Sequence, residues 1–144
     1  MDLIQRVRDA ARQLPVKRTI VFPESLDARV LDAARTGRDQ GLFEPLLIGS
    51  GEEVRAAVVK QFGSGVTLAI ADPAQDPDFA KLAAAYHHGR AAKGVTATEA
   101  AREAADPVVF ASLLVRHGRA HGVVSGATHT TADTVRAYLR TFGP

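Results

Sequence analysis

The sequence has 144 residues, of which 46% are hydrophobic and 24% charged, a balance typical of a globular protein with one buried core. The formal net charge is only +2, and basic and acidic residues alternate, so no basic face for nucleic acid is expected. Cysteine is absent, which excludes disulfides, thiolate metal sites and an acyl-cysteine intermediate. Because no apolar run is long enough for a membrane span or a signal peptide, we expect a cytoplasmic protein without membrane contacts.

The first third of the chain predicts a helix, a strand and a second helix. Apolar residues recur at three- and four-residue steps over residues 3–14, and Pro15 ends that helix. The unbroken apolar run Thr19–Phe22 predicts a strand covered on both faces, as in a parallel sheet. Ser25 is the expected N-cap of the next helix, which fades near Gly37.

The same alternation continues to the end of the chain. Residues 45–48, 66–70 and 122–124 are predicted strands, and a helix with an acidic first turn begins after the first of them. Further helices are expected at 78–92, 96–104, 107–117 and from Thr130 onward. Alternating strands and helices predict an α/β fold of three layers, with a parallel sheet flanked by helices and right-handed crossovers.

The strongest candidate for a binding site is the loop at residues 125–131. Ligands of open α/β sheets bind beyond the carboxyl ends of the strands, and this loop follows the fourth predicted strand. Small residues allow a ligand to come close to the backbone. Thr130 lies three residues before Asp133, which is the spacing of a capping box, so Thr130 is the expected N-cap. The start of the last helix therefore predicts an anion site that uses Ser125, Gly126, Thr130 and Thr131, although a plain capped turn has the same pattern.

Cationic side chains on two helices are candidates to clamp a phosphate. Arg136 lies near the start of the last helix, and Arg90 lies on an earlier helix beside Lys93, where that helix breaks. Each could instead be a solvated surface charge. His129 lies inside the glycine-containing loop, either as a donor to the ligand or as a group that orders the loop.

Several other kinds of site are disfavoured. No metal site is expected, because His87 and His88 point apart on a helix and Gly118 interrupts the helix between His117 and His121. The sequence lacks the hydrolase G-x-S-x-G turn, the P-loop and the dinucleotide G-x-G-x-x-G pattern. A serine hydrolase, a nucleotide hydrolase and a dinucleotide dehydrogenase are therefore disfavoured.

Residues 122–136 resemble a specific family segment. They match the V-S-G-A-x-H-S/T-T-A-D-T-x-R pattern of the phosphate acetyltransferase family almost throughout. Residues 19–24 also resemble that family, and residues 86–96 carry its Y-x-x-x-R-x-x-K-G-V-T pattern. These segments occur in the family's order, and the resemblance covers essentially the whole chain.

The resemblance implies reversible acyl transfer between acetyl-CoA and phosphate, with coenzyme A as a substrate and without metal or other cofactor. Arg90 and Arg136 correspond to two arginines that the family assigns to coenzyme A binding, and the loop 125–131 falls at its interdomain cleft. The expected fold is the first segment of a two-domain acyltransferase, and the full-length protein is expected to be a homo-oligomer, a dimer.

The chain also departs from the family. Family members are longer, so we expect residues 1–144 to be the N-terminal part of the domain, without the inserted second domain and the returning C-terminal segment. The Ser, Arg and Asp credited with catalysis lie in that absent part, so we assign no catalytic residue here and expect no activity from the chain alone. The family usually has Pro-Ala at Ala137-Tyr138, a change expected to affect helix packing and not the motif.

Alternative functions remain open from the sequence. A phosphate butyryltransferase differs only in an apolar pocket, where one or two methylenes change binding by about 1–3 kcal/mol. The same fold also occurs as an acetyl-CoA-sensing regulatory domain of hybrid malic enzymes, although a start at Met1 with its own helix favours the free-standing enzyme. A truncated gene product without activity is a third reading.

Overall fold

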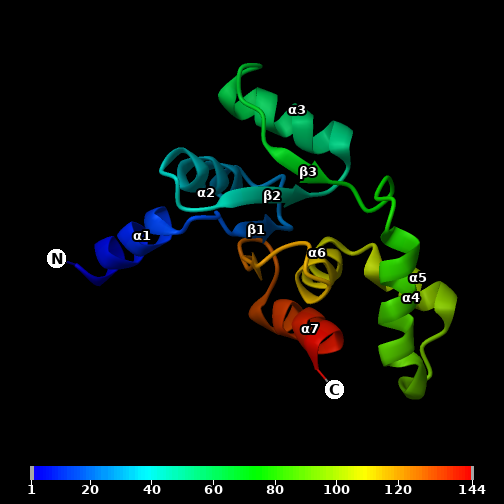
Figure 1. The fold of residues 1–144 in the computed structure, drawn as a ribbon. Coiled ribbons are helices and arrows are strands. Elements are labelled where there is room, and N and C mark those ends of the chain that lie inside the picture. The colour runs from blue at the N-terminus through cyan, green and yellow to red at the C-terminus, as the bar shows by residue number, and fades with distance from the viewer. Residues whose placement is uncertain (1, 144) are drawn as a thin grey trace.

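The computed structural model describes residues 2–143 and consists of helices around one four-stranded sheet (Figure 1). The strands are β1 (Thr19–Phe22), β2 (Glu44–Ile48), β3 (Ala69–Ala71) and β4 (Gly122–Val123). The helices are α1 (Leu3–Gln13), α2 (Ala28–Asp39), α3 (Gly51–Phe62), α4 (Phe79–Arg90), the 3₁₀ turn η1 (Ala91–Lys93), α5 (Ala97–Ala104), α6 (Pro107–Arg116) and α7 (Thr131–Phe142). The strand order is β3-β2-β1-β4 with every pair parallel, which confirms the predicted α/β fold.

Consecutive strand residues face opposite layers of the molecule. Val21 and Ile48 contribute to a core with the helices α4 to α7, whereas Phe22 and Leu47 contribute to a second core with α2 and α3. All four are almost completely buried. Because successive side chains of a strand point to opposite faces, a run without polar alternation needs cover on both sides. The two helical layers provide that cover, and the predicted three-layer arrangement is confirmed.

The second helix begins two residues later than the sequence pattern predicted. Asp27, not Ser25, is the N-cap, and its carboxylate accepts a hydrogen bond from the amide of Arg29 at 2.9 Å. The Ser25 hydroxyl is buried, donates to the carbonyl of Phe22 at 2.7 Å and accepts from the amide of Ile48 at 2.9 Å. Ser25 therefore ties together the carboxyl ends of β1 and β2.

The third strand is shorter than predicted. Of the predicted residues 66–70, only Ala69 and Ile70 pair with β2, and the pairing continues to Ala71. The register would place Leu68 opposite Pro45, which has no N–H to contribute to a ladder. The carbonyl of Thr67 instead accepts a hydrogen bond from Arg38 at 2.6 Å. Leu68 is nevertheless buried, so its apolar side chain serves the core without strand pairing.

The strand order places two distant loops side by side. From β1 the chain proceeds to β2 and β3 on one side, and it returns through α4, α5 and α6 to β4 on the other side of β1. The loops that follow β1 and β4 therefore meet at the same end of the sheet (Figure 1). This change of direction in an open parallel sheet is where ligands of such folds bind.

Candidate functional site

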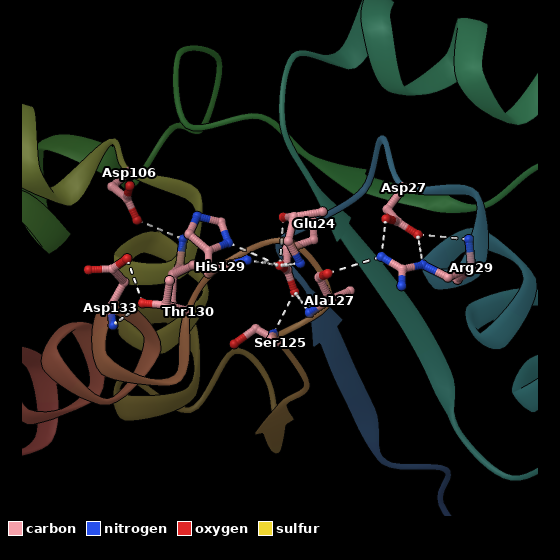
Figure 2. Close-up of polar contacts among 12 residues, drawn as sticks. Glu24, Asp27, Arg29, Asp106, Ser125, Ala127, His129, Thr130 and Asp133 are labelled. Carbon is pink, nitrogen blue, oxygen red and sulfur yellow. Dashed lines mark hydrogen bonds and ion pairs between the residues drawn. The ribbon is translucent and has the colours of Figure 1, made fainter.

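The loop after β4 folds around the side chain of Glu24, which follows β1 (Figure 2). The Oε1 atom of Glu24 accepts from the amides of Gly126 at 2.6 Å and Ala127 at 3.0 Å. The Oε2 atom accepts from the amide and, at 2.7 Å, the hydroxyl of Thr128, and from the amide of His129 at 2.9 Å. The predicted row of amides exists, but it surrounds an anion that the protein itself supplies.

Glu24 is held in its ionised form by these donors. Its side chain is only 1% exposed, and burial alone would raise the pKa of a carboxyl group. Hydrogen bonds from the side chain and amide of Thr128 and from the amides of Ala127 and His129 outweigh burial and hold the pKa well below its usual range. A fixed negative charge thus lies at the carboxyl end of β1.

The imidazole of His129 is part of the same arrangement. Its Nδ1 atom lies 3.0 Å from Oε2 of Glu24, and its side chain is 35% exposed. A carboxylate without a proton can only accept hydrogen bonds, so Nδ1 carries the hydrogen in this contact. Of the two predicted roles of His129, the structure shows directly that it contributes to the order of the loop.

The last helix begins as the sequence predicted. Thr130 is the N-cap of α7, and its hydroxyl oxygen accepts from the amide of Asp133 at 3.1 Å. Neither Glu24 nor the Thr130 side chain uses the amides of Thr131 and Ala132 at the exposed start of this helix. These two amides therefore remain candidates for contact with a ligand anion.

Ser125 contacts the residue at which the chain departs from the family pattern. Its hydroxyl lies 2.7 Å from the hydroxyl of Tyr138, and both side chains are part-buried. The expectation that the change at Ala137-Tyr138 leaves the motif untouched is therefore wrong. An alanine in place of Tyr138 would have no hydroxyl for this bond, and Ser125 would lose its partner.

The structure brings the two predicted arginines to one cavity. Arg90 at the end of α4 and Arg136 on α7 line a hollow of about 340 Å³, together with Lys93, Arg140 and the apolar side chains of α7. Within residues 2–143, the buried Nε atom of Arg90 has no hydrogen-bond partner. Arg136 is more exposed and pairs with Asp133 at 2.8 Å. The cavity is strongly cationic, with one buried donor unused.

Arg136 also borders a second cavity, of about 420 Å³, between α5, α6 and α7. Arg102, Arg140 and His129 line it as well, so two arginines beyond the predicted pair face this region. Glu103, Asp106 and Asp133 line the same cavity and balance the charge of its three arginines. Glu103 also accepts a hydrogen bond from the hydroxyl of Tyr86 at 2.6 Å, and burial, assisted by this contact, raises the pKa of Tyr86 to about 12.

A third cavity, of about 510 Å³, opens at the carboxyl ends of β1 and β2. Its wall contains Leu26, Ile48, Val54 and two prolines, and its charged groups are acidic, apart from the imidazole of His129. No lysine or arginine lines it. Among residues 2–143, no group of three or more His, Asp or Glu side chains is arranged to hold a metal ion. In the same range, no helix is long and apolar enough to cross a membrane.

Comparison with known proteins identifies the family. The model of the family described as "Phosphate acetyl/butaryl transferase" matches residues 2–144. The chain belongs to this family. Phosphate acetyltransferases of Paracoccus denitrificans and Bacillus subtilis share 41% identity over 143 residues and 36% over 140, which is 99% and 96% of this chain. These matches cover 41% and 42% of the relatives, so the chain spans about two fifths of their length.

Solved structures of phosphotransacetylases have the same fold. The enzyme of Streptococcus pyogenes superposes with a TM-score of 0.85 at 36% identity, over 98% of this chain and 43% of that chain. A phosphotransacetylase of Staphylococcus aureus superposes with a TM-score of 0.86 at 27% identity, over 99% of this chain and 44% of that chain. The phosphate acetyl/butaryl transferase fold thus accounts for the arrangement of sheet, loop and helices described above.

Proposed function

We propose that the protein to which this chain belongs transfers an acetyl group between coenzyme A and phosphate, and that this chain supplies a coenzyme A-binding wall. The names of the relatives support the reaction. The observation that carries the proposal is the common cavity of Arg90 and Arg136, because these residues lie 46 positions apart and come from different helices. Coenzyme A is a polyanion, and several converging guanidinium groups suit its phosphates.

Arg90 is the strongest single indicator of a bound anion. Burial of a guanidinium nitrogen without a hydrogen bond is costly, and an anion bound at this cavity would supply the acceptor that Arg90 lacks among residues 2–143. Arg136 has Asp133 as a partner and lies largely in solvent, so its contribution to binding is smaller. Lys93 and the amides at the start of α7 complete the proposed phosphate-binding wall.

Calorimetric titration of the chain with coenzyme A tests this proposal. Loss of a charge-assisted hydrogen bond costs about 1.5–3 kcal/mol, so Arg90→Ala should weaken binding by roughly one to two orders of magnitude. Arg136→Ala should weaken it less. Arg8→Ala is the matched control, because Arg8 lies on the exposed helix α1, away from the cavity (Figure 1). Equal affinities of the Arg90→Ala and Arg8→Ala variants would contradict the proposal.

The longer protein is expected to supply the catalytic residues. The resemblance assigns the catalytic Ser, Arg and Asp to parts of the family sequence other than residues 1–144, so this chain should bind coenzyme A without forming acetyl phosphate. We place residues 1–144 at the N-terminal part of the domain, before an inserted second domain and a returning segment. We also propose a cytoplasmic homodimer that uses no metal or other cofactor. The relatives' greater length supports the placement of this chain within a longer domain.

A further inference from the structure

Among residues 2–143, only His129 lines both the second and the third cavity. One of these cavities is lined by three arginines and three carboxylates. The other is lined by apolar side chains with acidic groups and no lysine or arginine. The imidazole therefore lies between a compartment in which arginines and carboxylates balance and one whose charged groups, apart from the imidazole, are all acidic. Figure 2 shows the ring of His129 beside Glu24, next to Thr130 at the start of α7.

The contact with Glu24 determines which ring nitrogen is available to a ligand. Both carboxylate oxygens of Glu24 are surrounded by donors, and Oε2 faces Nδ1 of His129 at 3.0 Å. The hydrogen of the neutral ring is thereby fixed on Nδ1, and Nε2 keeps its lone pair. Within residues 2–143, Nε2 has no hydrogen-bond partner, so an acceptor remains unused at the junction of two cavities.

We propose that His129 contacts the pantetheine arm of coenzyme A and that Glu24 is its positioning residue. This inference rests on the proposed function. Coenzyme A has an anionic nucleotide end and a neutral arm with two amide groups that leads to the thiol. The nucleotide end matches the cationic cavity of Arg90, which shares Arg136 and Arg140 with the second cavity, and the neutral arm matches the cavity without lysine or arginine. Nε2 accepts a hydrogen bond from an amide N–H where the arm passes between them.

Glu24 thus performs two tasks in this arrangement. It gathers the amides of residues 126–129, so these amides are not available to the substrate's phosphates. It also fixes the ring of His129 with Nε2 toward the ligand. The phosphates are left to the arginines and to the first amides of α7, and the arm is directed toward the carboxyl ends of β1 and β2.

The test compares two ligands and one conservative variant. Asparagine at position 129 can still donate to Glu24 through its side-chain amide, but it lacks the atom that reaches the cavity. His129→Asn should raise the dissociation constant of coenzyme A about three- to tenfold, the effect of one lost hydrogen bond. Binding of adenosine 3′,5′-bisphosphate, which lacks the arm, should not change. Arg136→Ala is the comparison variant, because it should weaken the binding of both coenzyme A and the bisphosphate.

Nitrogen-15 NMR of the imidazole provides a second readout that a purely structural role would not change. In the unaltered chain, the neutral His129 ring should carry its proton on Nδ1. In Glu24→Gln, one oxygen that accepts from the loop amides is replaced by an NH₂ group that cannot accept, so the ring is held less firmly and coenzyme A should again bind less tightly. An Nε2–H tautomer in the unaltered chain overturns the inference, even where the Glu24→Gln variant does not fold.

The outcomes separate this inference from the proposed function. If the unaltered chain binds coenzyme A and His129→Asn binds it equally well, only the inference fails. If His129→Asn weakens coenzyme A and the bisphosphate to the same extent, the ring contacts the nucleotide end and the inference also fails. If the unaltered chain binds neither ligand, the proposed function fails and the inference with it.

Discussion

Replacement of Glu24 by glutamine should destabilise the chain strongly at neutral pH and much less in acid. The glutamine side chain has the same shape, but it carries no charge and turns an NH₂ group toward amides that donate. A hydrogen bond to a charged group contributes about 1.5–3 kcal/mol, and the bonds of one carboxylate are not additive. The loop is exposed, so water can satisfy part of what is lost. We expect a loss of about 3 kcal/mol in the free energy of unfolding at pH 7.

The pH dependence has a definite sign. Folding lowers the pKa of Glu24, so its contribution is complete above the unfolded value of about 4.3 and is lost as the pH falls toward the folded value. Each pH unit in this window removes about 1.4 kcal/mol from the contribution of Glu24 to the free energy of unfolding. The difference in this free energy between the unaltered chain and Glu24→Gln should therefore be about 2 kcal/mol smaller at pH 3 than at pH 7. Other carboxylates affect both proteins alike.

Urea unfolding at pH 7 and pH 3 measures both quantities. Glu44→Gln is the matched control, because Glu44 is exposed at the start of β2 and should change stability by less than about 0.5 kcal/mol. A Glu24→Gln variant as stable as the Glu44→Gln variant would refute the reasoning, because the carboxylate would then not hold the loop. A gap that stays constant between the two pH values would show that the charge is not the cause.

Two further contacts and one exposed apolar surface should have measurable effects on stability and association. Arg119 holds the buried carboxylate of Asp76 at 2.8 and 2.7 Å, and this contact lowers the pKa of Asp76, so Arg119→Ala should cost about 1–2 kcal/mol. Thermal unfolding of Arg119→Ala, Asp76→Asn and the double variant measures the coupling energy between the two side chains. Losses of stability that simply add would contradict the prediction. Tyr138→Phe and Ser125→Ala should each cost about 1 kcal/mol, and the double variant should cost little more than either single one in urea unfolding. Val124, Leu139 and Phe142 expose about half or more of their surface, so the isolated chain should self-associate. In analytical ultracentrifugation its average mass should rise with protein concentration. A monomer at all concentrations would contradict this.

The sequence predicted the fold well because its signals are local. The apolar run Thr19–Phe22, the helix with an acidic first turn after residues 45–48 and the N-cap Thr130 depend on residues that are close in sequence. All three occur as expected. The shift of the second helix to Asp27 was not predictable with the same certainty, because Ser25 and Asp27 are both good caps. Only the pairing of β1 with β2 gives Ser25 its other partner.

The site was predicted only in part because its contacts are not local. Glu24 stands about one hundred residues before the loop that it holds, and only the position of β4 beside β1 brings them together. The sequence did contain a signal for this contact. Glu24 is a carboxylate directly after one buried strand, and a row of small residues follows another strand. Arg102 and Arg140 gave no motif signal, because their approach to His129 depends on how α5 and α7 pack.

The most direct test of the central claim is a map of the coenzyme A contacts on the chain. Titration of the ¹⁵N-labelled protein with coenzyme A, followed by backbone amide shifts, locates the bound ligand without any substitution. The largest changes should fall on η1, on the first turns of α7 and at His129, where the arginine-lined cavities lie. Changes confined to α1, or to the outer faces of α2 and α3, would contradict the account.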